Sequence, residues 1–404
     1  MVEHLVADGE LTDPRLRAAL LRVPREVLLP HAYVRVSGPG ADPIDWRLLD
    51  GSHPDDRAEW LDLVHSGDSV LLQRNGEPLS GLGRGPVTGG HMTSMSTCTP
   101  ATVEALQRLG LEPGQRFLDL GTGPGITLAL AAAVTGPGHA TGVEADPHMS
   151  AFARRNLGRL DLGAEVVEGD ALDGHATGAP YDRIHSGIGV SCLPPAWPAQ
   201  LAPGGRLLTT LTTRTPSWPG QLSVTRTPKG GLRALLQGRP RGCRPLLGYR
   251  WLTAVDHRDR VRADPGRPRP TRLAPPADDA HGFWVAAAYL APGLVRDFQA
   301  GAMTIVAPRE DSWAVAGPGA GTVRVHGPRD VWAELEDLHD RWDRAGRPDT
   351  YHVEMPDGDG PQHVTSGTGR KALAWTLPPH AAVPRRSSSP ARRGSPDSLQ
   401  EGTP

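Results

Sequence analysis

The residues whose types and spacing best suit binding chemistry lie in a glycine-rich segment between residues 116 and 146. An apolar run, Phe117–Leu120, leads into the turn Gly121–Gly125. An alanine-rich stretch follows, and a second apolar run then ends at Glu144. This order predicts a buried strand, a tight turn, a helix and a second parallel strand. Glycines let the backbone approach a ligand, and the acid can accept hydrogen bonds from ribose hydroxyls. The segment therefore predicts the first βαβ unit of a nucleotide-binding sheet.

The spacing of the glycines distinguishes two classes of ligand. Dinucleotide-binding turns have the pattern G-x-G-x-x-G, whereas this turn has G-x-G-x-G, with Asp119 before it and Pro124 inside it. An acid beside the turn suits a positively charged ligand and would repel a pyrophosphate. The pattern resembles the first motif of class I S-adenosylmethionine-dependent methyltransferases, whose methyl donor carries a sulfonium and an ammonium group. The alternative is a glycine turn that only connects a strand to a helix.

This resemblance implies that residues at three successive strand ends bind the cofactor. In this class an acid after the third strand binds the adenine amino group, and Asp170 follows the third expected strand, Glu165–Val167. Asp170 can instead be a solvated loop acid. Ligands of open parallel sheets lie beyond the carboxyl ends of the strands, where these residues would meet. The candidate cofactor-binding residues are Asp119, Gly121, Thr122, Gly123, Gly125, Glu144, Asp170 and Ala171.

Residues 92–212 resemble, more narrowly, the protein-L-isoaspartate O-methyltransferase family. Tyr181–Ile184 is followed by two prolines, an L-x-P-G-G turn at 201–205 and a further apolar run, which is the order of that family's fourth and fifth strands. A weaker likeness covers residues 10–37. The resemblance implies a Rossmann-like, doubly wound α/β sheet of the class I methyltransferase type. It also implies S-adenosyl-L-methionine as cofactor and an aspartyl or isoaspartyl carboxylate of a peptide or protein as acceptor.

A cluster of serines and threonines precedes the helix expected after Pro100. In the family a serine at this place contacts the reacting carboxylate. Counting back from the proline-glycine turn after the helix favours Ser96 and Thr97, which are the candidate catalytic residues. Counting back from Pro100 favours Cys98. These hydroxyls can instead cap the helix, and this is the preferred interpretation for Thr99.

The acceptor implied by the resemblance needs little acid–base assistance. A carboxylate is ionised at neutral pH and can attack a methyl carbon without a strong general base. The protein's expected contribution is to align oxygen and methyl carbon and to exclude water. His91 and His185 can assist a different nucleophile, and neither is a candidate site residue. His185 follows the expected fourth strand, where the family usually has small apolar residues.

Composition divides the chain into four expected regions. They are an N-terminal helix with an insertion (1–90), a cofactor-binding core (91–215), a C-terminal α+β accessory or substrate region (216–378) and a disordered tail (379–404). The tail is too polar to bury enough apolar surface to fold. Within the third region, residues 256–280 are expected to be an exposed linker. Short strands are expected at Leu222–Val224, Leu232–Leu236, Tyr249–Leu252, Phe283–Leu290 and Met303–Val306.

The insertion and a C-terminal helical stripe resemble methyltransferases that accompany ribosomally made peptides modified by ATP-grasp or lanthionine chemistry. This implies an aspartate of a precursor peptide as acceptor and a maturation ligase as a further candidate partner. The stripe can also be ordinary core packing, which is the preferred interpretation. Alternative functions are protein repair, methylation of a small metabolite by the same fold, and non-catalytic peptide binding. The stripe consists of Trp332, Leu335, Leu338 and Trp342.

Composition also restricts the partners of this 404-residue chain. A formal net charge of −2 gives no electrostatic case for nucleic acid or an anionic membrane. No apolar run approaches the about twenty residues needed to span a bilayer, and the N-terminus lacks the pattern of a secretory signal. Three scattered cysteines do not form a disulfide framework or a metal site. The sequence predicts a cytoplasmic protein that binds no nucleic acid, membrane or metal.

Overall fold

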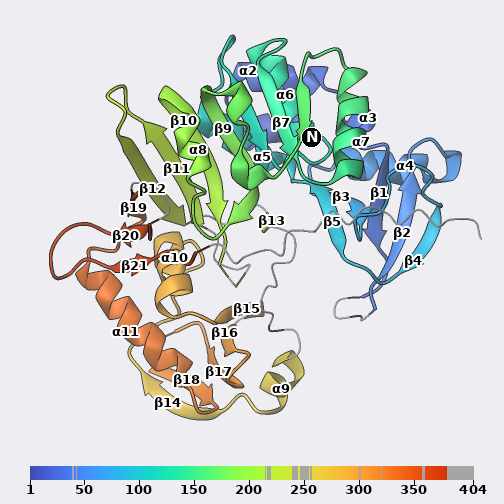
Figure 1. Cartoon of the computed structure of the whole chain (residues 1–404). Coiled ribbons are helices and arrows are strands. Elements are labelled where there is room, and N and C mark those ends of the chain that lie inside the picture. The colour runs from blue at the N-terminus through green and yellow to red at the C-terminus, as the bar shows by residue number, and fades with distance from the viewer. Residues whose placement is uncertain are drawn as a thin grey trace, which may run out of the picture.

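The computed structural model describes residues 1–38, 41, 43–213, 215, 220–238, 244–245, 254, 257–299, 302–319, 321–356 and 360–379. These residues form three sheets, of five, eleven and five strands (Figure 1). The strand expected at Tyr249–Leu252 lies outside the described residues, and so does the expected tail apart from Pro379.

The N-terminal residues form helices and an antiparallel sheet of order β4-β2-β1-β3-β5. Asp13 caps α2, because its Oδ1 accepts a hydrogen bond from the Arg15 N–H at 2.8 Å. The boundary expected between residues 90 and 91 falls inside this sheet, since β5 pairs with β3. The elements are α1 (Val2–Ala7), α2 (Pro14–Arg22), α3 (Arg25–Leu28), β1 (His31–Arg35), β2 (Asp45–Asp50), α4 (Pro54–His65), β3 (Val70–Arg74), β4 (Gly85–Thr88) and β5 (Met92–Ser96).

The central sheet begins with five parallel strands in the order β8-β7-β6-β9-β10. Helix α5 packs on β9 and β10, α6 on β6 and β7, and α7 on β7 and β8. This is the predicted Rossmann-like α/β architecture. Its elements are α5 (Thr99–Leu109), β6 (Phe117–Leu120), α6 (Ile126–Thr135), β7 (Ala140–Glu144), α7 (Pro147–Gly158), β8 (Glu165–Glu168), η1 (Ala171–Asp173), η2 (Ala176–Gly178), β9 (Tyr181–Val190), α8 (Ala196–Ala199) and β10 (Leu201–Leu211).

The fourth parallel strand is longer than the sequence predicts. Strand β9 continues to Val190, so His185 lies within the sheet and not in the loop beyond it. His185 is the cross-strand partner of Asp119 on β6. The sheet therefore brings together two residues that are 66 positions apart in sequence.

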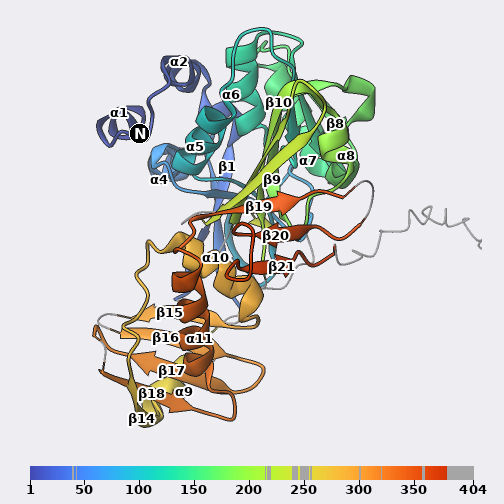
Figure 2. The same ribbon diagram turned by 90° about the vertical axis from the view of Figure 1, so that its left-hand side faces the viewer.

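The central sheet continues beyond the core region expected from the sequence. Strand β11 pairs antiparallel with β10, and β12 pairs with β11 and β19. The sheet therefore continues across the boundary expected between residues 215 and 216, because the hairpin that follows β10 covers its open edge. In Figure 2, β19, β20 and β21 lie between the central strands and the C-terminal sheet. The edge elements are β11 (Gly220–Arg226), β12 (Leu232–Gly238), β13 (Arg244–Pro245), β19 (Thr350–Glu354), β20 (His363–Thr365) and β21 (Ala374–Thr376).

The third sheet is antiparallel, in the order β14-β18-β17-β16-β15, and α11 packs on β16, β17 and β18. Residues 283–290 were expected as a strand but belong to helix α10, because a short, continuous apolar run fits either element. The expected linker at 256–280 contains α9 and β14. The elements are α9 (Arg258–Ala263), β14 (Arg267–Thr271), α10 (His281–Leu290), β15 (Val295–Gln299), β16 (Ala302–Ala307), β17 (Ser312–Ala316), β18 (Gly321–His326) and α11 (Val331–Arg344).

The aromatic and leucine stripe of α11 faces the core. Trp332 and Leu335 are fully buried, and Trp342 is 7% exposed. The indole N–H of Trp332 donates to Thr271 Oγ1 at 2.8 Å, which ties the helix to β14. Core packing, and not peptide contact, is therefore the role of this stripe.

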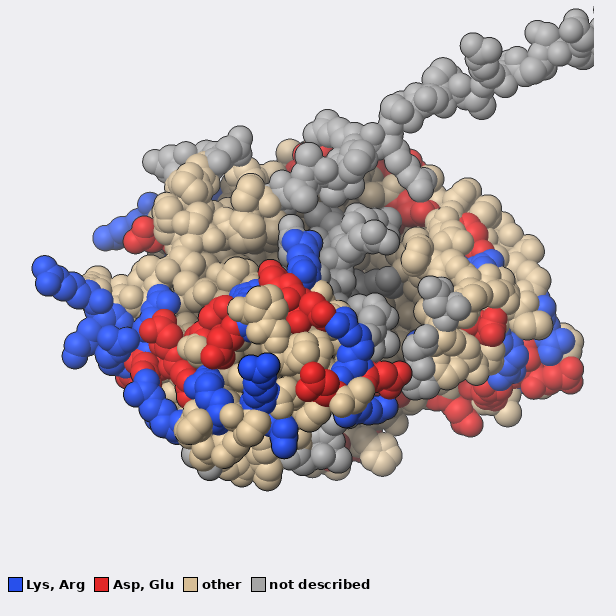
Figure 3. All heavy atoms as spheres, turned by 90° about the horizontal axis from the view of Figure 1, so that it is seen from below, with Lys and Arg blue, Asp and Glu red and all other residues tan. Residues whose placement is uncertain are grey.

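Charged side chains of both signs are interspersed on the face shown in Figure 3. Ion pairs among the described residues include Arg269 with Glu336 at 3.1 Å and Arg329 with Glu334 at 2.7 Å. Among the described residues, no helix combines the length and apolar character needed to cross a bilayer.

Candidate active site

The turn between β6 and α6 requires glycine at several positions. Gly121, Gly123 and Gly125 have φ values of +73°, +53° and +93°, which L-residues with a side chain rarely adopt. A Cβ at Gly121 would lie 2.6 Å from Ile188 Cγ2, and one at Gly125 would lie 2.9 Å from Leu157 Cδ1. The positive φ therefore explains why all three positions are glycine, and close packing against β9 and α7 adds a second reason at Gly121 and Gly125.

Glu144 at the end of β7 fixes the position of this turn. Its Oε2 accepts a hydrogen bond from the Gly123 N–H at 2.9 Å, and its Oε1 accepts one from the Asp146 N–H at 3.0 Å. Burial raises the pKa of the Glu144 carboxyl, although the hydrogen bonds from Asp146 and Gly123 oppose the increase. Each carboxylate oxygen has a second lone pair with which to accept a ribose hydroxyl.

Asp170 and Ala171 lie at the neighbouring strand end. The Gly169 N–H donates to the Glu144 carbonyl at 3.0 Å, which joins the ends of β7 and β8. Asp170 is exposed, and its Oδ1 accepts the Leu172 N–H at 2.9 Å, thereby capping η1. Ala171 is buried in the hydrophobic core, so its side chain does not face solvent.

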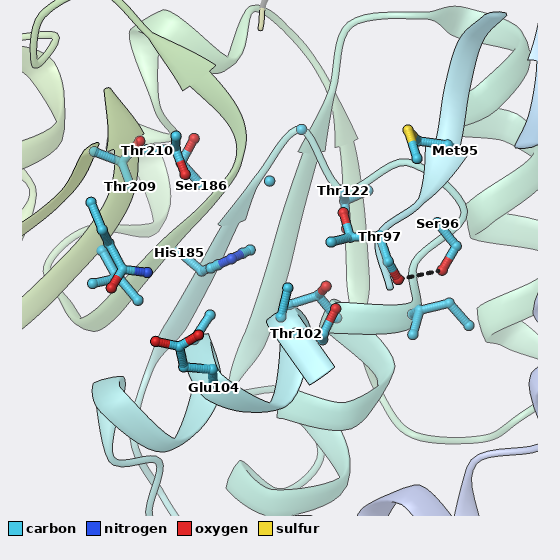
Figure 4. Close-up of a pocket in the computed structure, with 18 of the residues that line it drawn as sticks. Met95, Ser96, Thr97, Thr102, Glu104, Thr122, His185, Ser186, Thr209 and Thr210 are labelled. Atoms are coloured by element: carbon cyan, nitrogen blue, oxygen red, sulfur yellow. Dashed lines mark hydrogen bonds between the residues drawn. The ribbon is translucent and has the colours of Figure 1, made fainter. Parts of the chain in front are cut away.

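A pocket opens beside the glycine turn, between β5, α5, β9, β10 and β11. Figure 4 shows Ser96, Thr97 and Thr122 on one side of it, Ser186, Thr209 and Thr210 on the other, and His185 between the two groups. Most of these polar groups are hydroxyls, which can donate hydrogen bonds to an anionic acceptor. The N-terminal residues of α6, Ile126 and Thr127, also line the pocket.

The structure brings together some of the sequence-predicted site residues and not others. Ser96, Thr97, Gly121 and Thr122 line the pocket. Gly123 and Glu144 meet through a hydrogen bond at its margin. The other predicted cofactor residues do not line this pocket; they are Asp119, Gly125, Asp170 and Ala171.

The sequence predicts that Asp119 contacts the cofactor directly, but in the structure this residue does not line the pocket. Its side chain is buried, with the residue only 1% exposed. Its Oδ2 accepts the Thr122 hydroxyl at 2.8 Å, and its Oδ1 lies 2.8 Å from His185 Nδ1. The cross-strand histidine and the turn threonine occupy the carboxylate, so Asp119 can act on the pocket only through those two residues.

The serine–threonine segment also differs from expectation in detail. Helix α5 starts at Thr99 and its N-cap is Cys98, so the predicted Thr99 cap is wrong by one residue. The Thr99 Oγ1 is buried without a partner among the described residues. Ser96 is buried, and its hydroxyl donates to the Thr97 carbonyl at 3.4 Å, a weak contact that a better acceptor can replace.

Sequence reasoning missed several residues of the pocket. Glu104 lines it from α5, Thr209 and Thr210 from β10, and Gln221 from β11. His185 is not among the predicted site residues, because a single histidine in a sequence is weak evidence for a role in a site. Its departure from the family pattern was the one signal in the sequence that could have identified it.

These groups fit S-adenosylmethionine. Glu144 offers oxygens to a ribose diol, and the Gly123 backbone is bare, since a Cβ there would meet no atom closer than 3.6 Å. The N-terminus of the ten-residue helix α6 favours the carboxylate of the donor's amino-acid portion. The turn, the acid and the helix start therefore provide partners for different parts of one molecule.

Comparison with known proteins gives a consistent result. The family model described as "Protein-L-isoaspartate(D-aspartate) O-methyltransferase (PCMT)" matches residues 86–217. The protein-L-isoaspartate O-methyltransferase of Aeropyrum pernix is 30% identical over 237 residues, covering 58% of this chain and 73% of that protein. That of Thermococcus onnurineus is 36% identical over 209 residues, covering 51% and 74%.

Among solved structures, a protein-L-isoaspartate O-methyltransferase aligns with 90% of this chain and 99% of its own, at a TM-score of 0.49 and 19% identity. The similarity to curated relatives extends over more than two thirds of their length. The chain therefore belongs to the protein-L-isoaspartate O-methyltransferase family and is an S-adenosylmethionine-dependent methyltransferase.

Proposed function

We propose that this enzyme methylates the side-chain or α-carboxylate of an isoaspartyl or aspartyl residue in a peptide or protein. The observation that carries the proposal is the pocket that joins the glycine turn to Ser96 and Thr97. The relatives from Aeropyrum and Thermococcus, named for activity on protein isoaspartate, support the same acceptor. The cytoplasmic location expected from the sequence stays a prediction.

In this proposal Glu144 accepts hydrogen bonds from the ribose hydroxyls and keeps the turn in place through Gly123. Asp170 is exposed and lies beside the end of β7, where it can turn from capping η1 to accept the adenine amino group. Ala171 is part of the hydrophobic core next to Asp170 and supports the position of that residue. Asp119 contributes indirectly, by orienting Thr122.

When bound, S-adenosylmethionine supplies an electrophilic methyl group. Ser96 and Thr97 hold one oxygen of the acceptor carboxylate by hydrogen bonds, which leaves the other oxygen to attack. The hydroxyl lining from β9 and β10 limits the directions in which the carboxylate can turn. The acceptor is already ionised at neutral pH, so the residues align it and exclude water without removing a proton.

Protein repair and peptide maturation differ in the acceptor residue, which is an isoaspartate in repair and an ordinary aspartate of a precursor peptide in maturation. The maturation hypothesis relied partly on the α11 stripe, and those side chains are buried in the core. We therefore propose an isoaspartyl acceptor first. Action on an aspartate of a precursor peptide, with a ligase as partner, stays a prediction that the same experiment tests.

The experiment uses three synthetic peptides of one sequence that carry aspartate, isoaspartate or asparagine at a single position. Each is incubated with enzyme and S-adenosylmethionine and then analysed by mass spectrometry before and after mild base. A single methyl on the isoaspartyl peptide that base removes supports the proposal, and an ester on the aspartyl peptide alone would favour maturation. A base-stable methyl, or methylation of the asparagine peptide, would overturn carboxyl transfer.

A further inference from the structure

His185 is a buried, titratable residue that the mechanism above does not use. It lines the pocket from the middle of β9, and its Nδ1 lies 2.8 Å from Asp119 Oδ1. The other ring nitrogen, Nε2, has no hydrogen-bond partner among the described residues and is not a fully enclosed atom. The ring is therefore held at one nitrogen and open to the pocket at the other.

The partner behind His185 is a carboxylate with very little access to water. Asp119 is 1% exposed, and its other side-chain partner among the described residues is the neutral hydroxyl of Thr122. A buried carboxylate is costly unless a positive group and hydrogen bonds compensate it. Protonated His185 supplies both, because an imidazolium donates from Nδ1 to Asp119 and still carries a proton on Nε2.

The other described residues that line the pocket include no competing positive charge for an anionic acceptor. The described residues that line the pocket include no lysine or arginine, so His185 is the one lining side chain among them that can become cationic. The charged groups around it are Asp119 on β6 and Glu104 on α5, whereas β5, β10 and β11 contribute hydroxyls, Leu208, Met95 and Gln221. An anionic acceptor entering this pocket would find its positive partner at His185 Nε2.

We propose that His185, protonated and oriented by Asp119, binds the acceptor carboxylate and makes the pocket selective for a carboxylate over its neutral amide. The inference rests on the proposed carboxyl transfer and adds a residue to it. Ser96 and Thr97 orient the acceptor through neutral hydrogen bonds, and His185 provides the charge. The alternative is a neutral His185 that acts as a base toward a hydroxyl or amide acceptor, and it predicts that replacing His185 lowers kcat and leaves peptide binding unchanged.

The test compares the wild-type enzyme with His185→Gln, which keeps a hydrogen-bond donor and loses the charge. His91→Gln is the matched control, since His91 is exposed and does not line the pocket. Binding of S-adenosylhomocysteine, measured by calorimetry, should agree within about twofold for all three proteins. This measurement shows separately that each variant is folded and keeps its donor site.

With the isoaspartyl peptide as substrate, His185→Gln should raise KM by about tenfold to hundredfold, the range expected for a lost hydrogen bond between charged groups. The value of kcat should change by less than about threefold, because the group acts on binding. His91→Gln should match the wild type in every respect.

Equilibrium binding gives a readout that does not depend on turnover. In the presence of S-adenosylhomocysteine, wild-type enzyme should prefer the isoaspartyl peptide over the same peptide with the carboxylate amidated, and His185→Gln should lose most of this preference. Unchanged kinetics in His185→Gln, or a loss confined to kcat, would overturn the role of His185 while leaving carboxyl transfer intact. A wild-type enzyme that binds S-adenosylhomocysteine but esterifies no peptide would overturn both.

Discussion

Replacing Glu144 tests how the donor site is built. The carboxylate holds two backbone N–H groups, those of Gly123 and Asp146, at 2.9 and 3.0 Å. Hydrogen bonds to a charged group contribute about 1.5–3 kcal/mol each when buried, and less where water can replace the lost partner. Glu144 is only partly buried, so Glu144→Ala should lower the free energy of unfolding by about 1–3 kcal/mol in total.

The effect on the ligand should be larger than the effect on the fold. Glu144→Ala removes the acceptors for both ribose hydroxyls and loosens the turn at Gly123. Two such hydrogen bonds correspond to about 3 kcal/mol or more, so S-adenosylhomocysteine should bind at least about a hundredfold more weakly. Glu144→Gln should fall between, because one amide oxygen can accept while the NH2 group faces a donor.

Isothermal calorimetry with S-adenosylhomocysteine measures this directly, and thermal unfolding reports the stability. Glu165→Ala is the control, since Glu165 is an exposed acid at the opposite end of the neighbouring strand β8. It should bind the ligand like the wild type. A folded Glu144→Ala protein whose affinity stays within about threefold of the wild type would refute the assignment of this acid to the ribose.

Three further predictions concern pH, the turn and the core. Burial raises the pKa of Glu144 above 4.5, and ribose hydroxyls bind the ionised form. The affinity for S-adenosylhomocysteine should therefore rise with pH through that pKa and level off above it. Calorimetry that shows no change in affinity on acidification, before the protein unfolds, would contradict this. Gly121→Ala should lower the free energy of unfolding, measured by chemical denaturation, by about 2–4 kcal/mol, because φ is positive and the new Cβ would contact Ile188. Gly138→Ala, where φ is positive but the space is open, should lower it by about 1 kcal/mol. Equal losses of stability in the two variants would exclude the contact with Ile188. Trp332→Ala should lower the free energy of unfolding by about 3–5 kcal/mol; an unchanged stability with a raised peptide KM would instead restore the peptide-contact interpretation.

The part of the site that depends on local sequence could be predicted well. The turn after β6 and the acid at the end of β7 follow from neighbouring residues, because a short strand, a glycine turn and a helix constrain one another within a few positions. Glycines at positive φ are recognisable from spacing alone. The structure joins Gly123 to Glu144 as that unit requires.

Features that depend on pairing across the sheet could not be predicted in the same way. The contact between Asp119 and His185 depends on the register of β6 against β9, and a short motif carries no information about that register. The same limitation placed the core boundary at residue 215, because the hairpin partner of β10 is visible only in three dimensions. Helix α10 was mistaken for a strand since its apolar run has no distinguishing period.

The insertion shows a third kind of limit. Its aromatic and aliphatic residues are buried in two different places. Trp60 and Val64 of α4 are buried in a cluster that also includes residues of α5, α6 and α7. Trp46 and Leu48 of β2 instead form a separate small core within the N-terminal sheet. The apolar character of these residues favours burial, but it does not indicate which surface buries them.

The most direct test of the account follows the methyl group itself. The enzyme is incubated with an isoaspartyl peptide and S-adenosylmethionine labelled in its methyl group, and the product is then treated with mild base. Transfer to a carboxylate predicts that almost all incorporated label is released as volatile methanol, and that the Ser96→Ala, Thr97→Val double variant releases far less. Label that stays on the peptide after base would show an N- or C-methyl product and would contradict carboxyl methylation in this pocket.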